Sequence, residues 1–250
     1  MENHGIIQDS RPGPMKIACL FDVDGTILDS RKCGTESFKL VLRDLYGWED
    51  PLAGIPIAGR TDLKILADVY AKCSGKKPEG GEWEAEVARL KDLYCVHLER
   101  MLREKPPFLC PGFPELFDSV AEAAGLDPGL GTGNFEEGAR LKIEAAGIDF
   151  SRFPYGGFGG ETEDRPSLLQ AGKERAKAVT GREVKAVVIG DTPEDCKAAK
   201  KIGAFIALVS TGPFPHDELE KLDPDFIARD FSDPAPFLQW LASLSTAPRK

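Results

Sequence analysis

The sequence predicts an α/β protein with a doubly wound parallel sheet and an inserted all-helical cap domain. Two observations carry this prediction. From residue 111 onward, short apolar runs alternate with helical patterns, which is typical of parallel strands joined by helices. A block of three helical patterns, residues 31–106, stands between the first apolar run and this alternating region. In such a fold, ligands bind beyond the carboxyl ends of the strands.

The first apolar run, residues 17–21, predicts a buried strand that opens the core. The block behind it predicts three helices: one around residues 38–45 that ends at Gly47, one that begins after Thr61, and one over residues 82–104. Lys105-Pro106-Pro107 follows as a stiff connector. We therefore divide the chain into a catalytic core, residues 15–30 and 107–250, and a helical cap, residues 31–106.

The alternating region predicts the rest of the core. Helices are expected at residues 115–124, 135–146, 167–179, 193–202 and 237–244. Strands are expected at residues 130–132, 186–189, 206–209 and 226–228. The glycine-rich stretch at 156–160 lacks the Gly-x-Gly-x-x-Gly spacing and a following helix, so we do not expect a nucleotide-binding loop there.

The composition is that of a globular protein, with 250 residues, 42% of them hydrophobic and 29% charged. The 32 basic and 41 acidic residues leave a net charge of −9, which argues against a nucleic-acid partner because such partners need a basic surface. No apolar run approaches the length of a membrane span, so a membrane is not an expected partner either.

Residues 1–14 lack the apolar segment of a signal peptide, and we expect them to form a disordered lead. The six cysteines are scattered and include no Cys-x-x-Cys pair. This usage favours a reducing, cytoplasmic location over a disulfide framework or a zinc site.

Asp22 and Asp24 leave the first strand and enter a Gly-Thr turn. Side chains two residues apart on an extended chain point to the same side, so both carboxylates can face one small volume. Like charges at that separation need a cation or a shared proton, and Mg²⁺ prefers carboxylate oxygens. The alternative is that Asp-Gly forms only a turn.

Other polar groups follow the later strands. Asp191 and Asp195 come after residues 186–190, and Asp195 also fits a capping-box position of the next helix, which by itself is the favoured interpretation. Thr132 and Gly133 lie in a strand-to-helix turn whose hydroxyl and N–H groups suit a phosphate oxygen, although such a turn is also ordinary loop chemistry. Arg165 would neutralise a phosphate or form a surface ion pair.

Taken together, these motifs resemble the haloacid dehalogenase superfamily of hydrolases, in its phosphoglycolate phosphatase-like branch with a helical cap. The resemblance covers about residues 15–245. Asp22-x-Asp24-Gly25-Thr26 matches the first motif, Thr132 the second, and Gly190-Asp191-Thr192-x-x-Asp195 the fourth. Arg165-Pro166 stands where the family usually has Lys-Pro, and Arg offers a planar fork in place of a point charge. Asp127-Pro128-Gly129 also interrupts the second strand, which predicts a very short strand and a less firmly held Thr132.

The resemblance implies a Mg²⁺-dependent phosphatase acting on a small phosphorylated metabolite. Asp22 would attack phosphorus, and Asp24 would protonate the leaving group and then activate water. The carboxylates of Asp22 and Asp191 and the carbonyl of Asp24 would bind the metal, with Asp195 holding a metal-bound water or orienting the other ligands. Thr132, Gly133 and Arg165 would contact the phosphoryl group.

Several alternatives stay open at this point. Dehalogenases of the family typically lack the second aspartate, so Asp24 favours phosphate esters. A phosphonate-cleaving relative would need a Schiff-base lysine such as Lys39 or Lys64 in the cap, which is disfavoured because a helical lysine is usually solvated. Arg60 either contacts an anionic part of the substrate or is merely exposed to solvent. A sugar-phosphate mutase and a catalytically idle binding module are the alternative functions.

Overall fold

Six parallel strands form the central sheet of the protein, in the order β5-β4-β1-β6-β7-β8. The computed structural model describes residues 15–76 and 79–246, so the predicted disordered lead at residues 1–14 lies outside the described residues. The strands are β1 (Ile17–Phe21), β4 (Gly129–Thr132), β5 (Gly156–Phe158), β6 (Lys185–Gly190), β7 (Phe205–Val209) and β8 (Phe226–Ala228). All of their pairings are parallel.

The first strand, β1, pairs with β4 on one side and with β6 on the other, which places it in the middle of the sheet. Its side chains alternate between two cores. Ile17, Cys19 and Phe21 belong to one apolar cluster, whereas Ala18 and Leu20 belong to another. A continuous apolar run is what a strand covered on both faces requires.

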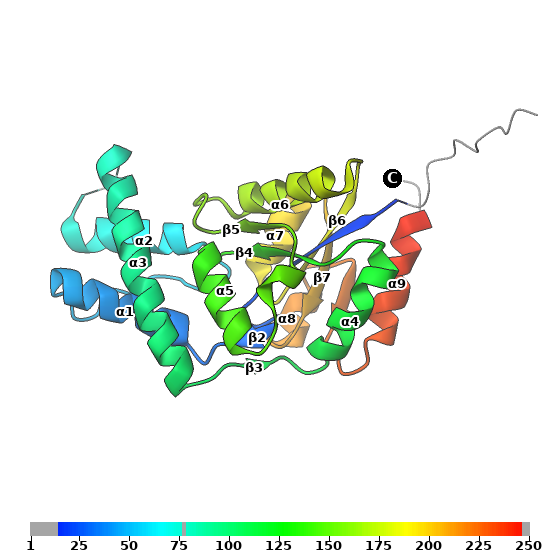
Figure 1. Cartoon of the computed structure of the whole chain (residues 1–250), viewed down its shortest axis with the longest axis horizontal. Helices are drawn as coiled ribbons and strands as arrows, with labels where there is room; N and C mark the ends of the chain where they lie inside the picture. Colours follow the sequence, from blue (N-terminus) through cyan, green and yellow to red (C-terminus); the bar gives the residue numbers. More distant parts are fainter. Residues whose placement is uncertain (1–14, 77–78, 247–250) are drawn as a thin grey trace, which may run out of the picture.

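Helices cover both faces of this sheet (Figure 1). One cluster holds side chains of α4 (Phe113–Ala124), α5 (Glu136–Ala145) and α9 (Ala235–Thr246). The other holds side chains of α6 (Arg165–Thr180), α7 (Pro193–Lys201) and α8 (His216–Glu220). A short 3₁₀ helix, Phe150–Arg152, follows α5. The predicted doubly wound architecture is therefore confirmed.

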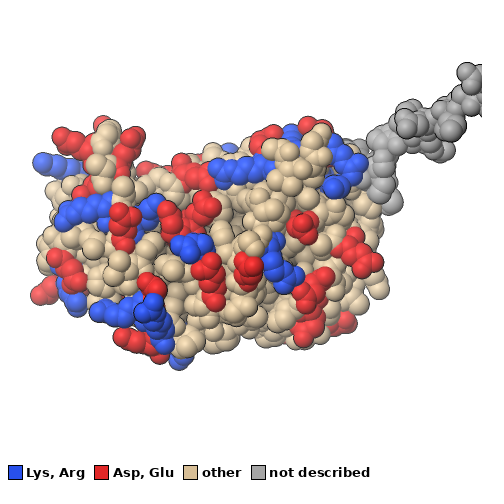
Figure 2. Space-filling model, viewed as in Figure 1, with Lys and Arg blue, Asp and Glu red and all other residues tan. Residues whose placement is uncertain are grey.

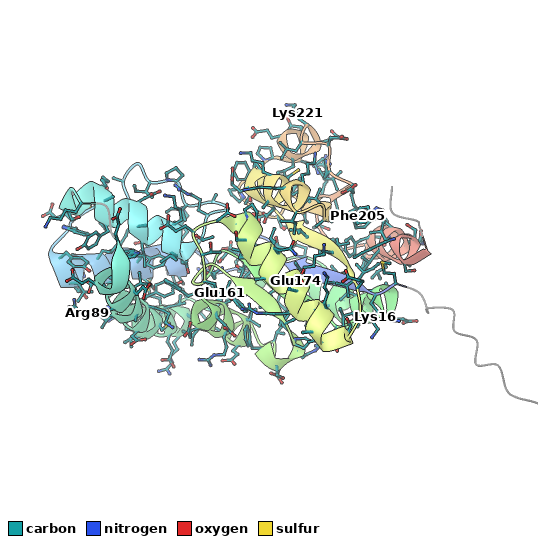
Figure 3. The ribbon with its side chains drawn as sticks, turned by 90° about the horizontal axis from the view of Figure 1, so that it is seen from above. Lys16, Arg89, Glu161, Glu174, Phe205 and Lys221 are labelled. Carbon is teal, nitrogen blue, oxygen red and sulfur yellow. The ribbon has the colours of Figure 1, made fainter. Side chains whose placement is uncertain are left out.

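Three further helices, α1 (Cys33–Tyr46), α2 (Asp62–Ser74) and α3 (Gly80–Glu104), lie at one end of the molecule (Figure 1). They bury an apolar cluster of their own, and the view from above shows Arg89 of α3 at the end of the molecule far from Lys16 (Figure 3). Gly47 caps α1 in the left-handed conformation, as predicted, and Gly75 caps α2 in the same way. The all-helical insertion is thus confirmed, while its division from the core at residues 31 and 106 stays a prediction.

The chain leaves and re-enters the core through a two-stranded antiparallel ribbon. This ribbon pairs β2 (Leu28–Asp29) with β3 (Phe108–Leu109). The strand β3 directly follows the predicted connector at 105–107. Neither two-residue strand was expected, because so short a segment carries no periodicity. The ribbon places the two crossings between core and helices side by side.

The structure corrects two expectations about strands. No strand was expected in the stretch at 156–160, but Gly156–Phe158 forms the edge strand β5. Thr132 is also held firmly: β4 is short, as expected, but all four of its residues are buried and it lies between β1 and β5. Pro128 precedes β4 instead of interrupting it, so no hydrogen bond within the strand is lost.

Within the described residues, no helix is both long and apolar enough to cross a membrane. On the face that Figure 2 shows, basic side chains are interspersed with acidic ones, and the described residues there form no extended basic patch. This distribution agrees with the acidic net charge of the chain.

Candidate active site

A cavity of about 700 Å³ lies at the carboxyl ends of β1 and β6, between the sheet and the helices α1–α3. Asp22, Asp24 and Asp191 line it from the core side, together with Gly133, Asn134 and Arg165. The elements that carry these residues are far apart in the sequence. Their meeting follows from parallel pairing, because parallel strands end at one edge of the sheet.

Asp22 directly follows β1 and is almost fully buried, with 6% of its surface exposed. One carboxylate oxygen accepts a hydrogen bond from the backbone N–H of Val23 at 2.8 Å, and the other accepts one from Arg165 at 2.9 Å. Burial raises the pKa of Asp22, and the guanidinium of Arg165 partly opposes that shift. An ionised Asp22 therefore depends on its cationic surroundings.

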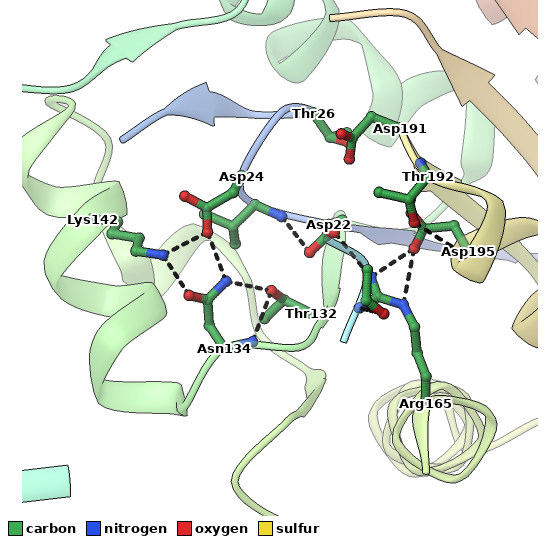
Figure 4. Close-up of polar contacts among 12 residues, drawn as sticks. Asp22, Asp24, Thr26, Thr132, Asn134, Lys142, Arg165, Asp191, Thr192 and Asp195 are labelled. Carbon is green, nitrogen blue, oxygen red and sulfur yellow. Dashed lines mark hydrogen bonds and ion pairs between the residues drawn. The ribbon is translucent and has the colours of Figure 1, made fainter. Parts of the chain in front are cut away.

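Arg165 is the first residue of α6, one residue after the N-cap Asp164. Its guanidinium donates to Asp22 and, at 2.6 and 3.0 Å, to Asp195, and it also donates to the backbone carbonyl of Gly59 at 3.1 Å (Figure 4). The surface ion pair considered for this residue is therefore excluded, since the side chain is buried. Its planar fork bridges two carboxylates, which a lysine ammonium cannot do in the same geometry.

Asp195 has the capping role that its position predicts. Thr192 accepts a hydrogen bond from the Asp195 N–H, and the Asp195 carboxylate accepts one in return from the Thr192 N–H at 3.1 Å. The same carboxylate binds Arg165, so both of its oxygens already have partners. This arrangement leaves Asp195 better suited to orienting its neighbours than to direct metal binding.

Asp191, which follows β6, is 1% exposed and accepts a hydrogen bond from the hydroxyl of Thr26 at 3.3 Å. One oxygen each from Asp22, Asp191 and Asp195 lies within 4.8 Å of the others. Burial, followed by repulsion from Asp195 and Asp22, raises the pKa of Asp191 well above its usual range.

The donor chemistry of this cluster fits a hard divalent cation. Among the described residues, Asp22 and Asp195 share Arg165, whereas no ion pair reaches Asp191. Buried carboxylates at this spacing repel one another unless a cation lies between them, and oxygen ligands are those that Mg²⁺ prefers. Asp22 and Asp191 are the residues best placed to hold such an ion.

Thr132, the last residue of β4, is completely buried. Its hydroxyl oxygen accepts hydrogen bonds from the Asn134 backbone at 3.3 Å and side chain at 2.8 Å, and the hydroxyl also contacts Asp22. Gly133 has no room for a side chain, because a Cβ there would lie 2.1 Å from the Arg60 carbonyl oxygen. The turn thus packs directly against the chain segment that precedes α2.

Asp24 faces the cavity, and three side chains hold it. Ser30 donates to one carboxylate oxygen. Asn134 at 3.0 Å and Lys142 at 2.5 Å both donate to the other, as Figure 4 shows. Burial raises the pKa of Asp24, but Lys142 and these hydrogen bonds outweigh it, so the pKa lies below its usual value.

Sequence reasoning missed Lys142 and Asn134. Lys142 lies on α5 with 3% of its surface exposed, on the same helix face as Ala139. A lysine on an otherwise apolar helix face was the available signal. Asn134 belongs to the turn after β4, in which only Thr132 and Gly133 were singled out.

Arg60 lines the cavity, but its guanidinium forms an ion pair with Asp68 of α2 at 2.8 Å.

Asp62, two residues after Arg60, is buried, and its carboxylate accepts a hydrogen bond from the Phe135 N–H of the core at 2.8 Å. Burial raises the pKa of Asp62 to about 7 despite the nearby ammonium of Lys142. The sequence assigned no separate role to Asp62.

Comparisons with known proteins agree with this geometry. The haloacid dehalogenase-like hydrolase family matches residues 18–203. A probable phosphatase, IndB of Dickeya dadantii, is 27% identical over 241 residues, which is 94% of this chain and 98% of that protein.

Two solved structures share the fold. The β-phosphoglucomutase of Clostridium difficile superposes with a TM-score of 0.63 at 14% identity, covering 92% of this chain and 99% of that one. CbbY of Rhodobacter sphaeroides, in complex with phosphate, gives a TM-score of 0.61 at 16% identity, covering 88% and 96%. At these identities the likeness supports the fold alone. With the family match over residues 18–203, the parallel sheet and the helical insertion, the chain belongs to the haloacid dehalogenase-like hydrolases.

Proposed function

We propose that this protein is a Mg²⁺-dependent phosphomonoester hydrolase that acts on a small phosphorylated metabolite through an aspartyl-phosphate on Asp22. The observation that carries the proposal is that Asp22, Asp24 and Arg165 line one cavity, while the buried hydroxyl of Thr132 contacts Asp22. The name of the relative IndB, a probable phosphatase, and the phosphate bound to CbbY support the same chemistry.

In the first step, a carboxylate oxygen of Asp22 attacks phosphorus and the bond from phosphorus to the leaving oxygen breaks. Because its pKa is low in the free protein, Asp24 has to take up a proton before this step; it then gives that proton to the leaving oxygen, so that an alcohol departs. Arg165 and the hydroxyl of Thr132 border Asp22 and would stabilise charge on the transferring group.

In the second step, water attacks the phosphorus of the aspartyl-phosphate. The Asp24 carboxylate accepts a proton from this water, the bond to Asp22 breaks, and phosphate leaves. Asp22 returns as a carboxylate and Asp24 as an acid, so one ester and one water yield one alcohol and one phosphate.

Asp22 and Asp191 would hold Mg²⁺, together with the carbonyl of Asp24, and Asp195 would orient these groups through Arg165. The bound ion would supply positive charge against the phosphoryl oxygens. Without it, burial raises the pKa of both carboxyls, and repulsion from Asp195 adds to the shift of each.

The substrate would be small, since a cavity of about 700 Å³ also has to accommodate the phosphoryl group. Its walls mix apolar side chains such as Phe38 and Ile65 with polar ones such as Thr35 and Lys39, which suits a compact polar metabolite. All six cysteines are free thiols, which supports a reducing compartment such as the cytoplasm.

The test is a screen of small phosphate esters with Mg²⁺ and with EDTA, comparing the wild type with Asp22→Asn. We expect release of phosphate that requires Mg²⁺, and a loss of at least about 10³-fold in kcat for the variant, because the amide is a poor nucleophile. Equal rates for both proteins would exclude Asp22 as the nucleophile.

The products also distinguish the alternatives. A mutase would return an isomeric phosphate ester with little free phosphate. A binding module would turn over no ester, although it would still retain the substrate in equilibrium dialysis.

A further inference from the structure

Lys142 forms a buried bridge beside the proposed acid–base residue. Its ammonium donates to Asp24 Oδ2 and to Asn134 Oδ1, both at 2.5 Å, while Asn134 Nδ2 donates to the same Asp24 oxygen at 3.0 Å. The three side chains therefore form a closed triangle of hydrogen bonds (Figure 4). Each member restricts the rotation of the other two.

The two ends of the ion pair differ in exposure. The side chain of Lys142 is 4% exposed, whereas that of Asp24 is 39% exposed and faces the cavity. Both side chains line the cavity, but the lysine is much the more deeply buried of the two. Burying an ammonium costs free energy, so a purely structural role would be served as well by an apolar side chain of similar length.

Ser30 completes the arrangement from the other side. It donates to Asp24 Oδ1, so both carboxylate oxygens are tied to neighbouring groups. Ser30 lies just after β2, Asn134 in the turn after β4, and Lys142 on α5. Donors from three separate elements hold one rotamer of Asp24 and keep its carboxyl directed toward the cavity.

We infer that Lys142, with Asn134, is a positioning residue that fixes Asp24 for proton transfer to the substrate's leaving oxygen and from the attacking water. This inference rests on the proposed phosphatase function. Proton transfer requires an oxygen of Asp24 within hydrogen-bond reach of the leaving group, about 2.6–3.2 Å, and a freely rotating carboxyl would meet that condition only part of the time.

The test compares two substrates in Lys142→Met and Lys142→Gln. The first is an alkyl phosphate, glycerol 3-phosphate, whose leaving oxygen needs a proton. The second is 4-nitrophenyl phosphate, whose leaving group departs as a stable anion. We expect the single-turnover formation of the aspartyl-phosphate to fall about 10²-fold for the alkyl ester and less than about threefold for the aryl ester.

Lys91→Met is the matched control. Lys91 also forms an ion pair with a carboxylate on α5, Glu137, but it does not line the cavity. We expect both esters to react with this variant at wild-type rates. The variants at Lys142 should fold, because Asp24 faces the cavity and can be hydrated when the ammonium is removed.

Equal losses for both esters, or near-wild-type rates for both, would overturn the inference. A crystal structure of Lys142→Met gives a readout that does not depend on activity. Displacement or alternate conformers of the Asp24 side chain would support positioning, and an unchanged Asp24 would refute it. If the wild type and Asp22→Asn proved equally active, the proposed function would fail, while this structural readout would still decide the role of Lys142.

Discussion

At the scale of single residues, the site is defined by an imbalance of charge around Asp191. Arg165 binds Asp22 and Asp195, and Lys142 binds Asp24. Among the described residues, no ion pair reaches Asp191, although it is almost fully buried. Because the pKa of Asp191 is raised, its ionised form destabilises the folded state at every pH above the usual pKa of an aspartate. A bound cation would remove this destabilisation.

This imbalance predicts opposite effects of Asp191→Asn with and without metal. Without divalent cations at pH 7.5, the variant should unfold at a higher temperature than the wild type, because the repulsion is removed. At a Mg²⁺ concentration one hundred times its Kd, the wild type should gain about 2.7 kcal/mol and the variant much less.

Thermal unfolding in EDTA and in MgCl₂ measures both effects, with NaCl at matched ionic strength as the control. A variant that gained as much from Mg²⁺ as the wild type would remove Asp191 from the metal site.

At the scale of elements, the close packing of α6 on β5 positions Arg165 at the site. A Cβ on Gly157 would lie 1.8 Å from the Leu168 carbonyl oxygen, so only glycine permits this approach. The contact lies one helical turn after Arg165, which is the first residue of α6. Gly157 therefore has a steric role, not a nucleotide-binding one.

Gly157→Ala should destabilise the protein by about 1–3 kcal/mol, because α6 has to move away from the sheet. Gly81→Ala on α3 is the matched control. A Cβ on Gly81 meets nothing within 4 Å, and alanine is the better helix former, so that variant should be neutral or more stable by up to about 1 kcal/mol. Urea denaturation measures both changes, and equal stabilities for the two variants would contradict the packing argument.

At the scale of the whole molecule, the helical insertion is joined to the core through the start of α2. The Asp62 N–H donates to the Gly133 carbonyl at 2.7 Å, and the Leu63 N–H donates to that of Gly159 at 3.2 Å. The Asp62 carboxylate in turn accepts a hydrogen bond from the Phe135 N–H of the core. These hydrogen bonds hold the insertion against the turn that contains Thr132.

The raised pKa of Asp62 predicts a pH dependence of this joint. Between the ordinary aspartate pKa near 4 and about 7, the folded state holds a proton that the unfolded state releases. The free energy of unfolding should therefore fall as the pH rises through this window, by roughly 4 kcal/mol at most from this group. Asp62→Asn should abolish that part of the dependence, since the amide does not titrate and its oxygen still accepts the Phe135 N–H.

Denaturation of both proteins at pH 4.5 and 7.5 measures the difference. The advantage of Asp62→Asn over the wild type should grow with pH, and a constant difference would show that Asp62 is ionised throughout.

The sequence alone predicted the fold class, most of the helices and strands, and the set formed by Asp22, Asp24, Thr132, Arg165 and Asp191. These features depend on local pattern: apolar periodicity sets the elements, and parallel strands bring their carboxyl ends together whatever lies between them. The strand β5 escaped prediction because its two consecutive glycines have no strand propensity of their own, and the second of them, Gly157, is required by the backbone of α6.

Only the tertiary structure decided the partners of the individual charges. Lys142 lies 118 residues from Asp24 in the sequence, and Asp62 lies 73 residues from Phe135. From local sequence alone, a lysine on a helix and an aspartate at a helix start are both expected to be solvated. Whether such a group is exposed or paired depends on which element packs over it, and that is a property of long-range packing, not of local pattern.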